Sequence, residues 1–207
     1  MRLRVMIGAG ALLLAGAAAG AAVGERFAPL TLEQMTPEQK RVAEAIMSGP
    51  RKSLEGPFNA WLRSPELADR LQRVGEYIRY QSSLPPRLNE FAILITAREW
   101  TAQYEWFAHR PLAVKAGLNP AIADDLAAGR RPRGMSADEV AVYDFVTSLY
   151  RERAVPQPIY QAARDLLSEQ QIADLLGLLG YYATGSMTLN VAEVPVPGEL
   201  PLKPLMR

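Results

Sequence analysis

The 207-residue chain contains no cysteine and only one histidine, His109. Without cysteine the protein cannot form disulfide bonds, thiolate metal sites or a thiol-based peroxidase centre. Neither sign of charge is in excess, because 23 lysines and arginines oppose 22 aspartates and glutamates. A nucleic-acid-binding protein usually carries a basic excess, so nucleic acid is not expected as a partner. Any chemistry must therefore use carboxylates, one imidazole, tyrosines and arginines.

The N-terminal segment has the pattern of a targeting sequence. After two arginines in the first four residues, an uncharged run rich in Ala, Gly and Leu extends from Val5 to Val23. It predicts an export signal over residues 1–22, with small residues suited to cleavage. The alternative is an uncleaved anchor, because the run approaches the ~20 residues that span a bilayer, but its Ala and Gly content favours cleavage. We then expect a periplasmic or secreted protein without stable membrane insertion, with its formal charge changed from +1 to −1 by the loss of two arginines.

The rest of the chain has the composition of one globular domain, with 49% hydrophobic and 22% charged residues overall. No segment shows the alternating pattern of a strand. Helix start signals recur at Thr36-Pro37 with Gln39, Ser64-Pro65, Ser136 with Glu139, and Ser168 with Gln171. We predict an all-α domain over residues 30–190, a compact bundle of about six to eight helices. A proline-rich tail over residues 191–207 follows it.

The histidine lies four residues after a carboxylate, Glu105. Residues four apart share one face of a helix, so the two side chains can meet. A carboxylate beside an imidazole can hold the tautomer of the ring and suits a general acid or base. An ordinary surface pair, or a buried histidine with satisfied hydrogen bonds, is the other interpretation that spacing alone leaves open.

Residues Pro86 to Leu118 carry a resemblance to a known family. The stretches "RLNEFAILITAREW", "YEW..H" and "A.KAGL" are similar to the carboxymuconolactone decarboxylase and alkyl hydroperoxidase D-like family. Its peroxidase branch has a glutamate, a Cys-x-x-Cys pair and a histidine; here these places hold Glu90, then Ala102 and Glu105, then His109. A sulfenate or disulfide cannot form on alanine or glutamate, so peroxidase activity is excluded. The chain is more similar to the decarboxylase branch, which also lacks the pair.

Glu90 and Glu105 can share a pocket only if the helix is interrupted between them. Fifteen residues of straight helix would separate Glu90 from Glu105 by about 22 Å. We therefore predict a helix from about Leu88, a turn or kink within residues 96–101, and a second short helix to His109. Capping patterns at Thr96 with Glu99, and at Thr101, are candidates for the break. Pro111 is expected to end or kink the second helix just past the histidine.

The resemblance implies an alkyl hydroperoxidase D-like helical bundle and an enzyme that needs neither a cofactor nor a metal. His109 would move a proton, Glu105 would orient or share it, and Glu90 would act as a second acid or base. Arg98 and Arg110 are candidates to receive a substrate carboxylate, and Tyr104 flanks the pair.

The expected function is proton transfer, with or without decarboxylation, on a small carboxylated lactone or related electron-poor acid. The enzyme would be a lyase or an isomerase. The resemblance also implies a homo-oligomer, as a dimer, trimer or hexamer. The alternative is a non-catalytic small-molecule-binding or scaffold protein with the same fold. A third interpretation, a metal held by Glu90, Glu105 and His109, uses suitable ligand types but too few of them.

Overall fold

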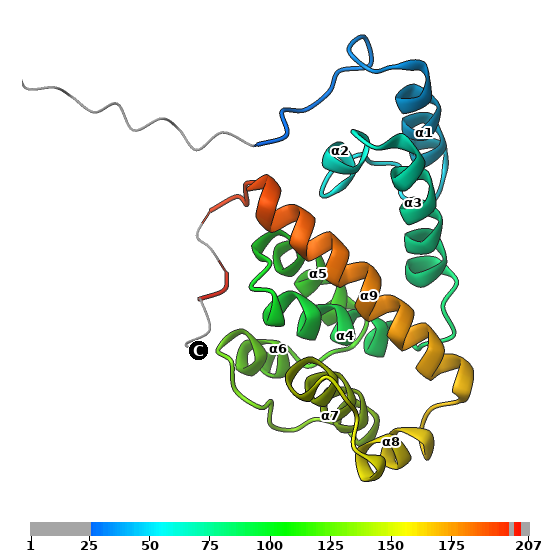
Figure 1. The fold of residues 1–207 in the computed structure, drawn as a ribbon. Coiled ribbons are helices and arrows are strands. Elements are labelled where there is room, and N and C mark those ends of the chain that lie inside the picture. The colour runs from blue at the N-terminus through cyan, green and yellow to red at the C-terminus, as the bar shows by residue number, and fades with distance from the viewer. Residues whose placement is uncertain (1–25, 199–200, 204–207) are drawn as a thin grey trace, which may run out of the picture.

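A computed structural model describes residues 26–198 and 201–203 of the chain (Figure 1). The expected export signal over residues 1–22 lies outside the described residues. Helices account for all the regular secondary structure of the described part: α1 (Pro37–Ser48), α2 (Phe58–Trp61), α3 (Pro65–Tyr80), α4 (Pro86–Glu99), α5 (Gln103–Lys115), α6 (Pro120–Ala127), α7 (Ala137–Glu152), α8 (Gln157–Arg164) and α9 (Glu169–Ala192). The all-α prediction is confirmed. The described residues form nine helices rather than six to eight, one of which, α2, has only four residues.

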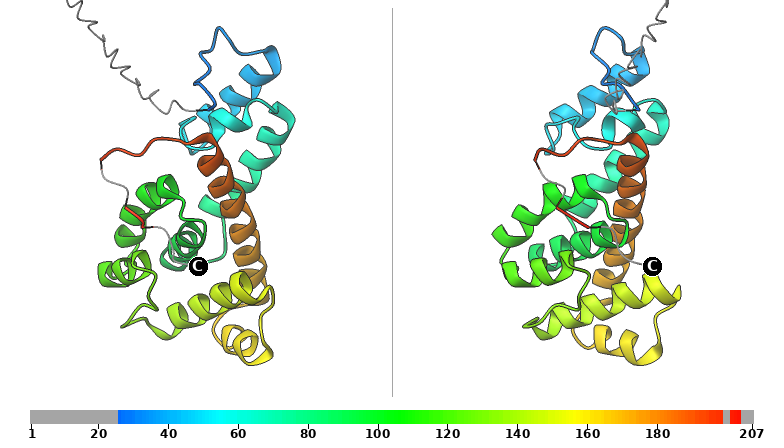
Figure 2. Two further views of the ribbon diagram at one scale, coloured as in Figure 1. Left: turned by 60° about the vertical axis from the view of Figure 1, so that its left-hand side comes forward. Right: turned by 90° about the vertical axis from the view of Figure 1, so that its left-hand side faces the viewer.

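Helix α4 is the centre of the bundle and packs against α5, α6, α7 and α9. Every residue of α4 from Leu88 to Arg98 is buried except Glu90, which is partly buried. A helix that is apolar on all sides is stable only when neighbours surround it, which explains the continuous run "FAILI". The long helix α9 passes α3 and α5. Figures 1 and 2 show α8 beside its N-terminal end, and α3 contacts α9 near its middle, where Gly177 lies close to Ile78 and Tyr181 lies close to Gly75.

Local capping signals place three of the helix starts where the sequence predicts them. Thr36, Ser136 and Ser168 each form a reciprocal capping box, with Gln39, Glu139 and Gln171 respectively. Such boxes satisfy two backbone groups that the first turn of a helix leaves unpaired. Ser64 also precedes a helix, but its side chain makes no capping hydrogen bond.

The break between α4 and α5 is present, at the end of the expected interval. Helix α4 ends at Glu99, and Thr101 has a left-handed backbone with φ of 47°. Ala102 is the residue before α5, so neither predicted cap is used. The Thr96 hydroxyl lies inside α4 and donates to the carbonyl of Ala92 at 2.9 Å.

Pro111 does not end the helix at His109, as one of the two predicted outcomes had it, because α5 continues through the proline to Lys115. A proline removes one backbone hydrogen bond from a helix. Ala113, in the turn after the proline, is fully buried, and α5 packs along α4. We attribute the continued helix to this packing.

The C-terminal tail begins later than predicted, because α9 extends to Ala192. Part of the tail contacts the start of helix α5. The Gln103 amide donates to the Leu202 carbonyl at 2.7 Å and accepts from the Leu202 N–H at 2.9 Å. The Leu202 side chain is buried. None of the described helices has the length and apolar character needed to cross a membrane.

Candidate functional site

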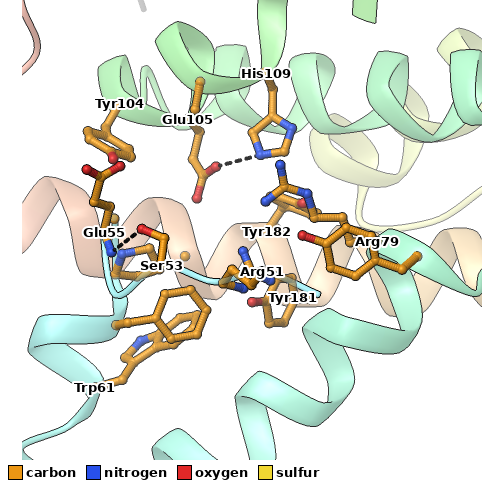
Figure 3. Close-up of a pocket in the computed structure, with 16 residues that line it drawn as sticks. Arg51, Ser53, Glu55, Trp61, Arg79, Tyr104, Glu105, His109, Tyr181 and Tyr182 are labelled. Atoms are coloured by element: carbon orange, nitrogen blue, oxygen red, sulfur yellow. Dashed lines mark hydrogen bonds and ion pairs between the residues drawn. The ribbon is translucent and has the colours of Figure 1, made fainter. Parts of the chain in front are cut away.

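A cavity of about 240 Å³ lies between α5, α9, α3 and the loop that follows α1 (Figure 3). Drug-sized ligands occupy pockets of roughly 300–1,000 Å³, so this one suits a small metabolite. One wall carries His109 and Glu105 from α5, and another carries Tyr181 and Tyr182 from α9.

His109 contacts both predicted glutamates, one on each ring nitrogen. Its Nδ1 lies 2.7 Å from Glu90 Oε2, and its Nε2 lies 3.5 Å from Glu105 Oε2. The ring is buried, with 3% of the residue exposed. The turn between α4 and α5 therefore brings together two carboxyl groups that are fifteen residues apart in sequence.

The two glutamates occupy different positions relative to the cavity. Glu105 lines it, whereas Glu90 does not and contacts the histidine from the other side. A carboxylate beside Nδ1 accepts a hydrogen bond from Nδ1–H. In a neutral imidazole the lone pair then lies on Nε2, next to Glu105. Glu90, which was expected to act as a second acid or base, thus contacts the imidazole ring and does not line the cavity.

Glu105 is a buried carboxyl group with an altered acidity. Burial raises its pKa above the ordinary value, and the nearby basic groups of His109, Arg79 and Arg51 oppose that rise without cancelling it. The close approach of α9 depends on Gly185. A β-carbon added there would lie 2.8 Å from Glu105 Oε1, so any larger residue would displace the carboxyl group.

The aromatic side of the cavity is a series of rings in edge contact. Tyr182 meets the His109 ring at a centroid distance of 5.0 Å, Tyr181 meets Tyr182 at 5.2 Å, and Trp61 meets Tyr181 at 5.8 Å. Burial raises the pKa of Tyr181 to about 12 and that of Tyr182 well above its usual value. Both phenols therefore keep their protons at neutral pH, as hydrogen-bond donors.

Of the three predicted substrate-binding residues, only Tyr104 lines the cavity. Arg110 forms an ion pair with Asp124 at 2.8 Å on the surface. Arg98 is buried at the end of α4, and its Nε and Nη1 have no hydrogen-bond partner. Neither Arg98 nor Arg110 is placed to receive a ligand in this cavity.

Sequence reasoning missed two other arginines that do line the cavity, Arg51 and Arg79. They lie 58 and 30 residues before the histidine, and no local spacing links them to it. Tyr181 and Tyr182 belong to an apolar stretch of a kind that is equally typical of a core helix. Among the residues that the structure describes, no group of three or more histidine, aspartate and glutamate side chains is arranged to hold a metal ion.

Comparison with solved structures supports the fold. The chain is similar to a crystallised protein of unknown function from Agrobacterium tumefaciens, described as a candidate antioxidant defence protein AhpD. The TM-score is 0.57 at 16% sequence identity, and the match covers 70% of this chain and 100% of that one. No protein-family model matches the sequence, and no curated protein does. The predicted alkyl hydroperoxidase D-like fold is thus confirmed, as a fold.

Proposed function

We propose that this protein is a cofactor-independent enzyme that transfers a proton on a small carboxylic acid, in the manner of carboxymuconolactone decarboxylase. The observation that carries the proposal is the position of His109, buried between Glu90 on Nδ1 and Glu105 on Nε2 at the wall of a cavity. A purely structural histidine needs one partner for one ring N–H. Here the second nitrogen faces an acid and a space for a ligand.

The three side chains divide the work of a general acid–base unit. Glu90 accepts a hydrogen bond from Nδ1–H. Its negative charge stabilises the imidazolium that forms when Nε2 takes a proton from a substrate carbon. Glu105, which holds its proton to a higher pH than an ordinary glutamate because burial raises its pKa, donates a hydrogen bond to an oxygen on which negative charge develops. A positioned acid or base typically contributes 10²–10⁴-fold in rate, and a dry, preorganised site adds to this.

The same unit serves isomerisation and decarboxylation. In isomerisation, Nε2 removes a proton from one carbon and returns it to another carbon of the same conjugated system. In decarboxylation, the electrons of the broken C–C bond move into a neighbouring carbonyl, CO2 leaves, and the resulting enolate carbon takes a proton from His109 Nε2, which has first taken that proton from solvent. Neither route consumes an oxidant or a reductant.

Solvent exchange tests the proposal even when the product of the reaction has not been identified. A panel of small carboxylated lactones and unsaturated acids is incubated with the protein in D2O, and NMR follows deuterium on carbon while a second assay follows CO2. We expect exchange or CO2 release from at least one compound, lost in His109→Gln. The matched control is Glu99→Gln, an exposed carboxylate on α4 that does not line the cavity.

The outcome also separates the enzyme from the alternative, a non-catalytic binding protein. If a panel compound binds the cavity and neither exchanges nor loses CO2, and if the His109→Gln variant binds it equally well, the acid–base proposal is contradicted and the binding protein is favoured.

We also propose an exported homo-oligomer. The export proposal depends on residues 1–22, and the oligomer proposal on the apolar side chains of α9 that stay exposed, Leu176, Met187 and Val191. Fractionation of cells that express the full chain tests the first, and light scattering of the purified protein tests the second. Retention in the cytoplasm, or a monomer at high concentration, would contradict them.

A further inference from the structure

Two arginines enter the cavity from the side opposite α5. Arg51 lies in the loop after α1, and Arg79 lies in the last turn of α3. Figure 3 shows both guanidinium groups directed toward the space in front of Glu105 and His109. Their positive charges lower the pKa of the Glu105 carboxyl group against the effect of burial, which agrees with this placement.

Neither arginine has a carboxylate partner among the described residues. Glu90 and Glu105 contact His109 instead, and no ion pair of the described residues includes Arg51 or Arg79. Arg51 Nη2 is buried and has no hydrogen-bond partner. A buried charged donor without a partner costs free energy. The unpartnered Nη2 of Arg51, with a second arginine beside it at the same cavity, therefore points to an anion that is supplied from outside.

Both guanidinium groups also rest on an aromatic ring. Arg51 lies over Phe58 at 4.5 Å from the ring centroid, and Arg79 lies over Tyr80 at 5.5 Å. A cation over an aromatic ring is a favourable contact. It uses none of the N–H donors of the guanidinium group, which can still bind a carboxylate through two hydrogen bonds.

From these contacts we infer that Arg51 and Arg79 form the receptor for the carboxylate of the ligand, and that the ligand is a small, planar, unsaturated carboxylate. Planarity follows from the wall of aromatic rings formed by Trp61, Tyr181 and Tyr182. The size follows from the volume of about 240 Å³. That this ligand is also the substrate rests on the proposed function. The arginines would then place the carbon next to the carboxylate within reach of His109 Nε2.

Calorimetric binding of unreactive probes tests the receptor independently of turnover. Benzoate, furan-2-carboxylate and the uncharged benzamide are titrated into wild type, Arg51→Gln, Arg79→Gln and the double variant. We expect wild type to bind a carboxylate probe more tightly than benzamide. Hydrogen bonds to charged groups contribute roughly 1.5–3 kcal/mol, so each single variant should bind the carboxylate about 10–100-fold more weakly, with little change for benzamide.

Three controls make the result decisive. Arg73→Gln changes an exposed arginine of the same helix, 71% of whose side chain is accessible, and should bind like wild type. Arg51→Lys with Arg79→Lys keeps the charge but loses the paired donors, and should be intermediate. Glu99→Gln should bind like wild type, because Glu99 is exposed on α4 and does not line the cavity. Melting curves confirm that each variant is folded.

The proposal is overturned if neither carboxylate binds wild type, if benzamide binds as tightly as benzoate, or if the folded double variant keeps wild-type affinity. Failure of the acid–base proposal looks different: carboxylates would bind through the arginines while no compound exchanges deuterium.

Discussion

The two charged walls of the cavity are built in opposite ways. On the α4 and α5 side, His109 has a carboxylate on each ring nitrogen, so this wall is complete without a ligand. On the α1–α3 side, Arg51 and Arg79 lie over aromatic rings but have no anionic partner in the described part of the chain. We propose that the first wall transfers protons and that the second wall binds the ligand. The difference teaches that reactivity and ligand affinity can be removed separately in this molecule.

The largest expected effect comes from the wall that carries the histidine. His109→Gln should lower kcat by about 10²–10⁴-fold because no other imidazole exists to move the proton. Glu90→Gln should lower kcat with little change in KM, because it misplaces the ring proton and leaves the arginines untouched. Steady-state kinetics on a panel substrate measure both. A large rise in KM for Glu90→Gln would mean that this wall also binds the ligand.

The next effect tests the aromatic side that separates the two walls. In Gly75→Ala the new β-carbon would lie 2.2 Å from the Tyr181 hydroxyl oxygen, so α3 and α9 must move apart. We expect a loss of about 1–3 kcal/mol in the free energy of unfolding, the usual cost of overpacking. Gly180→Ala is the control, since nothing lies within 4 Å of its added carbon. It should gain about 0.5–1 kcal/mol from helix propensity.

Denaturant unfolding of the two variants gives the measurement. Equal stabilities for Gly75→Ala and Gly180→Ala would show that the contact between α3 and Tyr181 is looser than described.

A smaller effect on stability, but a larger one on rate, is expected from Gly185→Ala. Its β-carbon would meet Glu105 Oε1 at 2.8 Å, at the free end of a side chain that can rotate away. We expect a cost of about 1 kcal/mol or less together with a clear loss of kcat. Carboxylate probes should still bind, because the arginines are unchanged. An unchanged kcat in a folded variant would remove Glu105 from the mechanism.

The smallest effect concerns the pH dependence of stability. Burial raises the pKa of Glu105, so the folded state holds this proton more tightly than the unfolded chain does. This contribution is fully present below the ordinary glutamate pKa of about 4.3 and is lost as the pH rises through the folded-state pKa. Glu105→Gln cannot lose it, so the variant should gain stability relative to wild type as the pH rises. Melting temperatures between about pH 4 and 8 test this, and parallel curves would contradict it.

The sequence predicts the features of this fold that depend on neighbouring residues. The capping boxes at Thr36, Ser136 and Ser168 need only residues three apart, and all three form. The break between α4 and α5 follows from the distance that fifteen residues of helix would impose. Its detail does not follow, because Thr101 adopts a left-handed backbone that a threonine rarely favours.

Features that depend on contacts between residues far apart in the sequence cannot be predicted from it. The packing of α5 on α4 keeps Pro111 inside a helix, and the fold alone brings Arg51 and Arg79 to the histidine. Arg98 and Arg110 are nearer to His109 in sequence and do not line the cavity. Spacing along one helix therefore pairs Glu105 with His109, whereas the proposed ligand-binding arginines are found only in the three-dimensional structure.

The most direct test of the central claim uses the fact that the chain has one histidine. Protein labelled with ¹⁵N-histidine gives the NMR signals of a single imidazole, which report which nitrogen carries the proton. In the neutral ring we predict the proton on Nδ1, hydrogen-bonded to Glu90, and a shift toward Nε2–H in Glu90→Gln. A wild-type ring protonated on Nε2 alone would contradict the proposed orientation of the base.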